Sequence, residues 1–360
     1  MDDFIRKRRQ KMRHGFGNIC LAAVLIAPLI SSCRLDHLYY ASSGTATVLV
    51  EPDWNASGIK PNGVSVYAYN ESDGSLYKRF PPVAAENKCY IKLPKGDFTL
   101  VVMNDTPEEF AGRIEFTGEE NLSTFQARGV KDEQRSQKLM EHLSSKSGSS
   151  SGEEEYCIVE PDTLAVSVVR GLHIAPEQVD YFHDRPQSDI SKETAVEVKV
   201  APEPVVSQVN ITAHVTGLKY ARGTTLSFLR GVAAGHCLGL GENSSDRASH
   251  AFILNNRTFD PGSDSNGTIR ANFLSFGLVG DGTTDSRYWL DINFVLINGE
   301  NHPLSFDVTD LIQVDVSLSL KLVLNLDLEI VLPEVVGSEE GGGFDTDVTE
   351  WEDEVVDIPM

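Results

Sequence analysis

The sequence predicts a mainly β protein with two consecutive β regions behind an N-terminal export segment. Short runs of alternating or β-branched residues recur along most of the chain, separated by Gly, Asn, Asp and Pro turns. The two regions meet at Pro202 and Pro204, which remove backbone donors and stiffen the chain. Every even position from 314 to 332 is apolar, as in strands with one buried face. We therefore expect two β-sandwich domains, covering residues 44–202 and 203–333.

The first β region is expected to hold short strands around an inserted helix. Its strands are predicted at residues 45–50, 63–69, 76–80, 89–93, 97–103, 113–116, 122–127, 164–169 and 195–200. Pro94-Lys95-Gly96 predicts a hairpin turn between two of them. Residues 131–143 carry apolar side chains near helical spacing, which predicts a short amphipathic helix. The helix and the Ser/Gly run after it form a predicted insertion near residues 131–156.

The second β region ends in an unusually long alternating segment. Earlier strands are predicted at residues 205–215, 225–229, 272–279 and 288–297, with a hairpin at Asn298-Gly299. As one strand, residues 314–332 would span roughly 63 Å, well beyond an ordinary sandwich strand. Either a break near residues 317–321 gives two strands, or one long strand bends between sheets. A membrane hairpin would alternate in the same way, but a barrel needs many such segments and the chain has one.

The N-terminus is expected to direct export and lipid attachment. Six basic residues precede an apolar run over residues 19–30, which is shorter than the roughly 20 residues needed to span a bilayer. Leu29-Ile30-Ser31-Ser32-Cys33 resembles the lipobox of bacterial lipoproteins. We expect residues 1–32 to be a cleaved signal peptide, Cys33 to carry the acyl chains, and residues 33–43 to form a tether. The alternative is an ordinary signal peptide with an incidental cysteine.

The charge of the chain excludes some partners. The formal net charge is −22, and removal of the signal peptide leaves about −26. Nucleic acid is not an expected partner, because binding phosphates requires clustered Lys and Arg. The same charge opposes electrostatic docking on anionic lipid. Residues 334–360 form an acidic tail with no basic residue, yet Phe344 and Trp351 give it apolar side chains with which to dock onto a domain.

The cysteines suggest no metal site and allow at most one internal disulfide. Cys20 leaves with the signal peptide and Cys33 takes the lipid, so three cysteines remain. These are Cys89, Cys157 and Cys237. The sequence does not name a disulfide pair, and buried free thiols fit equally well.

Three motifs resemble functional loops, and each fails a test of context. Residues 148–152 read G-x-S-x-G, but they lie in a low-complexity run and not between a strand and a helix. The glycines of residues 231–241 lack the spacing of a phosphate loop. Residues 260–267 place Gly262 at the first ligand position of a calcium loop. We therefore expect no enzyme activity, no metal and no cofactor beyond the covalent lipid.

Four stretches together carry a family resemblance. They are Gly63-Val64-Ser65-Val66-Tyr67, Leu93-Pro94-Lys95-Gly96, Phe306-Asp307-Val308-Thr309-Asp310, and Gly341-Gly342-Gly343-Phe344-Asp345 with Trp351-Glu352. With the lipobox and the two β regions, they resemble the fimbrillin-like lipoproteins of the Bacteroidales. The resemblance implies two tandem transthyretin-like (Greek-key) β-sandwiches, and some members of that group anchor or cap fimbriae. It supplies no active site.

The expected function follows from the anchor and the resemblance. The protein is predicted to be an outer-membrane lipoprotein on the periplasmic or cell-surface face. Its expected role is structural or adhesive, as a fimbrial anchor or accessory subunit that contacts fimbrial subunits or other envelope proteins. The alternative is a surface glycan-binding lipoprotein, which needs an exposed aromatic platform. The candidates for that platform are Trp54, Tyr67, Tyr69 and Trp289.

Overall fold

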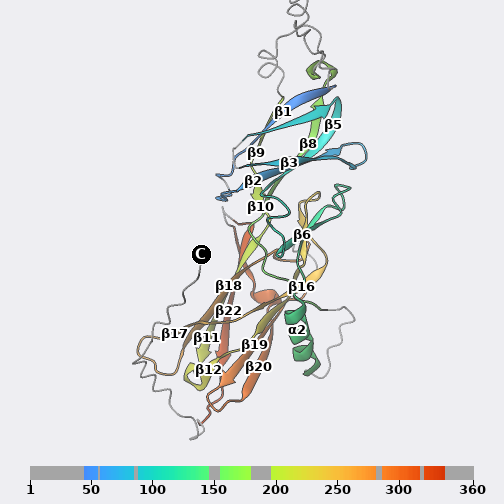
Figure 1. Ribbon diagram of the computed structural model, residues 1–360. Coiled ribbons are helices and arrows are strands. Elements are labelled where there is room, and N and C mark those ends of the chain that lie inside the picture. The colour runs from blue at the N-terminus through green and yellow to red at the C-terminus, as the bar shows by residue number, and fades with distance from the viewer. Residues whose placement is uncertain are drawn as a thin grey trace, which may run out of the picture. The chain divides into compact units, whose positions relative to one another are not determined.

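The described part of the chain folds mainly into β-strands, which form five sheets (Figure 1). The computed structural model describes residues 44–55, 57–84, 88–145, 155–179, 196–280, 286–316 and 320–336. The predicted signal peptide, Cys33, the tether, the G-x-S-x-G motif and most of the acidic tail lie outside these residues. Within the described part of the chain, no helix is long and apolar enough to cross a membrane.

The N-terminal β region contributes two sheets. Their strands are β1 (Thr45–Pro52), β2 (Gly63–Asn70), β3 (Leu76–Ala84), β4 (Cys89–Pro94), β5 (Gly96–Asn104), β8 (Ala165–Ile174), β9 (Val196–Val200) and β10 (Glu203–Pro204). One sheet has the order β4-β1-β9 and the other the order β10-β8-β5-β2-β3. In β2 and β5, nearly every residue is buried, because each is an inner strand with both faces covered.

The predicted hairpin at Pro94-Lys95-Gly96 is wrong. Strands occur on both sides of this turn, but β4 belongs to the three-stranded sheet and β5 to the five-stranded one. The two edges of β5 are already occupied by β2 and β8, so neither is left for β4. Gly96 has φ +142°, a conformation that favours glycine, at the point where the chain changes sheet.

A smaller sheet joins strands from both halves of the sequence. Its order is β15-β14-β7-β6, formed by β6 (Ile114–Thr117), β7 (Gln126–Gly129), β14 (Gly235–Cys237) and β15 (Glu242–Asn243). After β7 comes α2 (Glu133–Ser145), close to the predicted helix. Asp132 caps it, because its Oδ1 accepts a hydrogen bond from the backbone N–H of Arg135 at 2.9 Å.

The C-terminal β region forms two larger sheets. Its strands are β11 (Ser207–Thr216), β12 (Ala221–Thr224), β13 (Ser227–Ala233), β16 (Arg247–Phe252), β17 (Asn256–Phe259), β18 (Gly267–Ser275), β19 (Trp289–Leu296), β20 (Asn301–Asp307), β21 (Gln313–Val316) and β22 (Leu322–Val331). Single 3-10 turns occur at Pro176–Gln178, Leu218–Tyr220 and Thr309–Leu311. One sheet has the order β17-β18-β11-β22-β21 and the other β12-β19-β13-β16, with β20 also paired to β19. Their inward side chains form one hydrophobic core, and the Asn298-Gly299 hairpin is confirmed between β19 and β20.

The long alternating segment consists of two strands. β21 and β22 pair as an antiparallel hairpin with Val316 opposite Leu322, which confirms the predicted break near residues 317–321. The even positions of β22 are buried from Leu324 onward, whereas Val316 is 89% exposed on the edge strand β21. Alternation therefore identified the strands, but it could not show that β21 lies at a sheet edge.

The two β regions share a second hydrophobic core. Tyr67 and Tyr69 of β2 belong to the same buried cluster as Ala233, Leu238 and Phe276 of the C-terminal region. The cluster lies at the small sheet, in which β7 of the N-terminal region pairs directly with β14 of the C-terminal region. A buried cluster of this kind resists hinge motion, since bending would expose apolar surface. The predicted domain boundaries stay a prediction, but the described halves are joined by packing and not only by the chain.

Gly231, Gly235 and Gly239 allow close approach of backbones. A Cβ at Gly239 would collide with the carbonyl oxygen of Leu122. We expect Gly239→Ala to destabilise the protein by about 1–3 kcal/mol, because the backbone must shift to admit the methyl group. Thermal unfolding would measure the change. Gly223→Ala is the matched control, since nothing lies within 4 Å of its Cβ, and equal losses in both variants would contradict the explanation.

Candidate functional site

Three of the four aromatic residues predicted for glycan binding are buried. Trp54 is 6% exposed, and Tyr67 and Tyr69 are 0% exposed. The ring of Tyr67 lies 5.0 Å from that of Phe125, and burial raises the pKa of Tyr67 to about 12. The Tyr69 hydroxyl donates a hydrogen bond to the carbonyl of Glu119 at 3.0 Å. These rings have no free face for a sugar, so they do not provide the exposed platform that glycan binding would need.

Trp289 is half-buried and lies at the edge of a polar network. The guanidinium of Arg230 is 5.8 Å from the centre of its ring, and the two residues are paired across β13 and β19. Of the four predicted aromatic residues, Trp289 is therefore the one that remains partly accessible.

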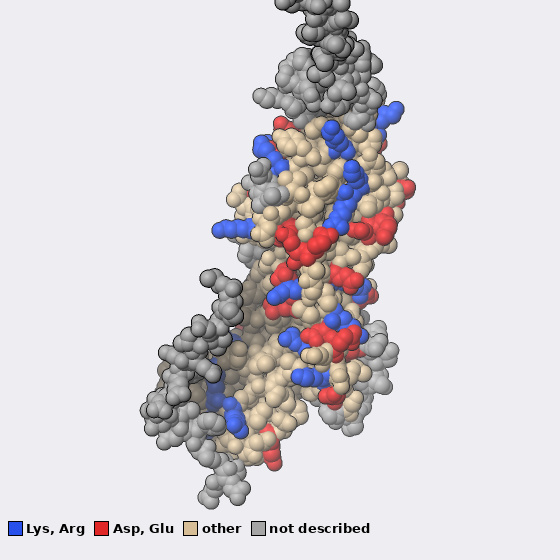
Figure 2. Space-filling view, in the orientation of Figure 1, with Lys and Arg blue, Asp and Glu red and all other residues tan. Residues whose placement is uncertain are grey.

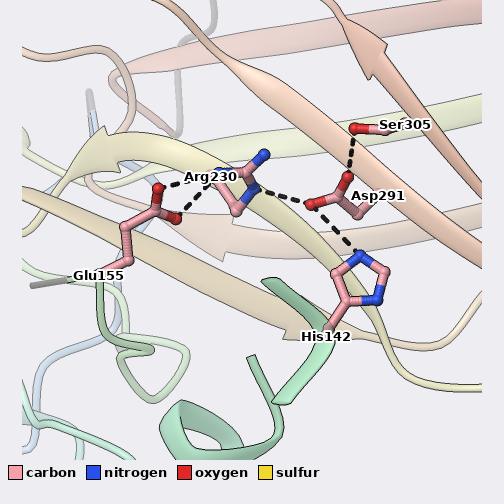
Figure 3. A network of polar contacts seen from close by, with 5 residues as sticks. All are labelled: His142, Glu155, Arg230, Asp291 and Ser305. Atoms are coloured by element: carbon pink, nitrogen blue, oxygen red, sulfur yellow. Dashed lines mark hydrogen bonds and ion pairs between the residues drawn. The ribbon is translucent and has the colours of Figure 1, made fainter. Parts of the chain in front are cut away.

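Five polar residues form a buried network on the outer face of the β13–β19–β20 sheet (Figure 3). Arg230 Nε donates to Asp291 Oδ2 at 2.7 Å, and Arg230 Nη1 contacts both oxygens of Glu155 at 2.9 and 3.0 Å. Ser305 Oγ donates to Asp291 Oδ1 at 2.5 Å. His142 Nε2 lies 3.7 Å from Asp291 Oδ2. The side chain of Asp291 is 0% exposed and that of Arg230 12%, so the ion pair is shielded from water.

The order of these contacts does not fit nucleophilic catalysis. In a Ser-His-Asp triad the histidine lies between the other two and takes the proton of the serine. Here Asp291 lies between the other two, and it accepts a hydrogen bond from Ser305 directly. The network is suited to holding structure in place.

The network fastens α2 to the C-terminal region. On the same sheet face, Leu139 of α2 packs with Cys157, Phe228 and Ala251 in a small buried cluster, and Figure 1 shows α2 beside β16 and β19. Asp291 lies between two residues that face the main core, so it must point to the opposite face. The sequence analysis did not single out any member of the network. A charged residue inside the apolar run Trp289–Leu296 was the available signal.

A second polar cluster lies near the small sheet. Lys321 Nζ donates to Asn243 Oδ1 at 2.8 Å, and His236 Nδ1 is 3.0 Å from the same oxygen. The amide nitrogen of Asn243 donates to the carbonyls of Phe276 and Leu278, both at 2.7 Å. Burial, with the nearby charge of Lys321, lowers the pKa of His236 to about 4. Burial also lowers the pKa of Lys321. The cluster ties the start of β22 to the small sheet.

A polar cleft of about 710 Å³ lies near the turn between β5 and β6. Its acidic groups are engaged in local structure. Asp105, at φ +54°, accepts hydrogen bonds from the Asn62 backbone N–H at 2.6 Å and from the Asn104 amide at 2.8 Å. Asp162 forms an ion pair with Arg113 at 3.4 Å. In the described part of the chain, no group of three or more His, Cys, Asp or Glu side chains is placed to hold a metal ion.

The three remaining cysteines are free thiols, so no disulfide joins them. Cys89 and Cys157 are buried, and Cys237 is half-buried. Burial raises the pKa of Cys157 to about 12, which keeps this thiol protonated and unreactive at neutral pH.

Residues 32–253 match a family model described as "Domain of unknown function (DUF5119)". The match covers more than half of the chain. The protein belongs to the DUF5119 family. No curated protein matches it in sequence.

Solved structures with low sequence identity are similar to this DUF5119 protein. A candidate adhesin from Bacteroides ovatus aligns with a TM-score of 0.51 and 18% identity, covering 81% of this chain and 94% of that one. The fimbrial anchor protein Mfa2 from Porphyromonas gingivalis aligns with a TM-score of 0.47 and 14% identity, covering 80% of this chain and 90% of that one. A candidate polysaccharide-binding protein from Bacteroides thetaiotaomicron aligns with a TM-score of 0.42 and 9% identity, covering 79% of this chain and 90% of that one. The fimbrillin-like resemblance is thus confirmed at the level of the fold.

Proposed function

We propose that the protein is an outer-membrane lipoprotein with a structural or adhesive role, attached through acyl chains on Cys33. The observation that carries this proposal is the shared core of Tyr67, Tyr69 and Phe276, which joins two β regions behind a predicted lipid anchor. A protein that transmits force or presents a binding surface needs a rigid body of this kind. The buried Arg230–Asp291 pair joins β13 to β19 in the same body, and Asp291 also contacts His142 of α2.

The finer architecture and the partners belong to the same proposal. We take the two β regions to be tandem transthyretin-like sandwiches, followed by the acidic tail. The partners are fimbrial subunits or other envelope proteins, with this chain as anchor or accessory subunit. One protein with a similar fold is described as a candidate adhesin, which supports an adhesive role for this chain. The order of contacts around Ser305 supports a role without enzyme activity.

The lipid anchor is tested by replacing its acceptor. We expect Cys33→Ala to move the protein from the membrane fraction to the soluble fraction, because each buried CH₂ of the lost acyl chains contributes about 0.8 kcal/mol of membrane binding. Cys20→Ala is the matched control, since this cysteine lies within the predicted signal peptide and should leave fractionation unchanged. Fractionation followed by immunoblotting gives the result. Membrane retention of Cys33→Ala would overturn the anchor.

The fimbrial role is tested on the same membranes. Outer membranes solubilised in mild detergent are passed over an antibody against this chain, and captured proteins are identified by mass spectrometry. Fimbrial subunits should be recovered from cells with the native protein. Their absence, with the anchor intact, would reject the fimbrial role and leave a lipoprotein of other adhesive function.

A further inference from the structure

A small pocket at one end of the C-terminal region has basic residues that form no ion pair with a described carboxylate. Its volume is about 260 Å³, and its lining includes Leu218, Arg222, Ile253, Arg257 and Phe294. Small-molecule sites usually measure roughly 300–1,000 Å³, so this pocket fits a single large side chain better. Ile253 is 52% exposed although it is apolar, which leaves hydrophobic surface at the rim.

The pocket lies within a basic patch that we define as Lys219, Arg222 and Arg257. All three side chains are exposed. Asp260 and Asp264 follow β17, but no ion pair joins any described carboxylate to the three cations of the patch. Figure 2 shows basic side chains gathered over the β12 end of this region. In a chain of net charge −22, such a patch is an exception.

Arg257 is held in place at the pocket wall. Its Nη1 donates to the carbonyl of Ala221 at 2.9 Å and its Nη2 to the carbonyl of Leu218 at 2.8 Å. Its guanidinium lies 4.7 Å from the ring centre of Phe259. A cation fixed in this way loses little further entropy on binding an anion, so the patch is prepared for a negatively charged ligand.

The chain delivers an acidic segment to this patch. At the end of β22, the backbone N–H of Leu332 donates to the carbonyl of Thr216 at 2.9 Å, two residues before the pocket residue Leu218. Residues 337–360 follow after four more residues, and they carry nine carboxylates and no Lys or Arg. The carboxylates are Glu339, Glu340, Asp345, Asp347, Glu350, Glu352, Asp353, Glu354 and Asp357. The apolar side chains of the segment include Phe344 and Trp351.

We propose that residues 337–360 bind the basic patch of their own chain and place an aromatic side chain in the pocket beside Arg257. Carboxylates pair with the three cations, and Phe344 or Trp351 covers the exposed surface at Ile253. Because the segment is tethered a few residues away, its effective concentration is in the millimolar range, and weak contacts suffice to hold it. The acidic tail then masks an anion-binding surface of the protein.

Zero-length carbodiimide crosslinking of the full chain tests this proposal. At low ionic strength, mass spectrometry should find carboxylates of residues 337–360 joined to Lys219, with several-fold lower yield at Lys78 and Lys131, which are exposed elsewhere. The Lys219 crosslink should fall several-fold in 0.5 M NaCl, because screening weakens exposed ion pairs. A mixture of isotopically labelled and unlabelled chains should show crosslinks within single chains.

A substitution in the exposed part of the patch gives the decisive comparison. Arg222→Gln leaves the hydrogen bonds of Arg257 intact and should reduce the Lys219 crosslink several-fold. Arg79→Gln, which replaces a half-buried arginine of β3, should leave it unchanged. The proposal is overturned if the tail crosslinks evenly to all three lysines, if Arg222→Gln has no effect, or if crosslinks join two different chains.

Discussion

Replacing Arg230 by methionine should reduce the free energy of unfolding by about 3–5 kcal/mol. The change leaves the carboxylate of Asp291 with 0% exposure and without its cation, which lies 2.7 Å away in the native protein. Ser305 and His142, which also contact Asp291, do not supply a full guanidinium charge at that distance. Urea unfolding followed by tryptophan fluorescence measures the loss, since Trp289 lies beside Arg230.

Two further variants show whether charge burial is the cause. Arg287→Met is the matched control, because Arg287 is 72% exposed in its pair with Asp307 and should cost at most about 1 kcal/mol. Arg230→Met/Asp291→Asn removes both charges, so it should recover part of the stability lost by Arg230→Met alone. If Arg230→Met costs no more than Arg287→Met, the network does not stabilise the protein in the way described.

The Arg230 network shows where sequence reasoning reached its limit. The run Trp289–Leu296 was correctly predicted as a strand, because side-chain alternation is a local property. Alternation places Asp291 on the outer face, where a charge is normally solvated. That face is covered by α2 and by residues near Glu155, more than 130 positions earlier in the sequence. The helix was predicted, but no local pattern specifies which sheet it covers.

The same limit explains the buried tyrosines and the wrong hairpin. Tyr67 and Tyr69 were candidates for an exposed aromatic platform, yet a second core shared with the C-terminal region covers them. The strands on both sides of Lys95 were predicted, but their sheet partners are distant in sequence. By contrast, the Asn298-Gly299 hairpin was predicted correctly, because its two strands are adjacent and Gly299 takes the φ of +85° that the turn requires.

Acid should destabilise the protein through two buried histidines. Burial lowers the pKa of His236 to about 4 and that of His250 to about 3, from an ordinary value near 6.5. Both are therefore neutral in the folded state, whereas the unfolded chain takes up protons below about pH 6.5. Since the unfolded state binds more protons, stability falls with pH from about 6.5 down to 4 for His236, and down to 3 for His250. The free energy of unfolding falls by about 3 kcal/mol through His236 and by about 5 kcal/mol through His250.

The surroundings of each histidine explain why protonation is unfavourable. His236 shares its hydrogen-bond partner Asn243 with Lys321, so a second positive charge would be repelled there. His250 Nε2 is buried without a hydrogen-bond partner among the described residues, and its ring lies 5.3 Å from that of Phe273. Neither site has a described carboxylate within ion-pairing distance to stabilise the cation.

Removing the titrating ring should flatten the stability profile. His250→Phe keeps an aromatic side chain against Phe273 and eliminates the proton uptake, so its melting temperature should fall less between pH 7 and pH 4 than that of the native protein. His173→Gln, an exposed histidine bonded to Asp97, should follow the native profile. Thermal unfolding across this range provides the comparison. If His250→Phe loses stability as steeply as the native chain, acid acts through carboxylates, and the buried histidines do not set the response.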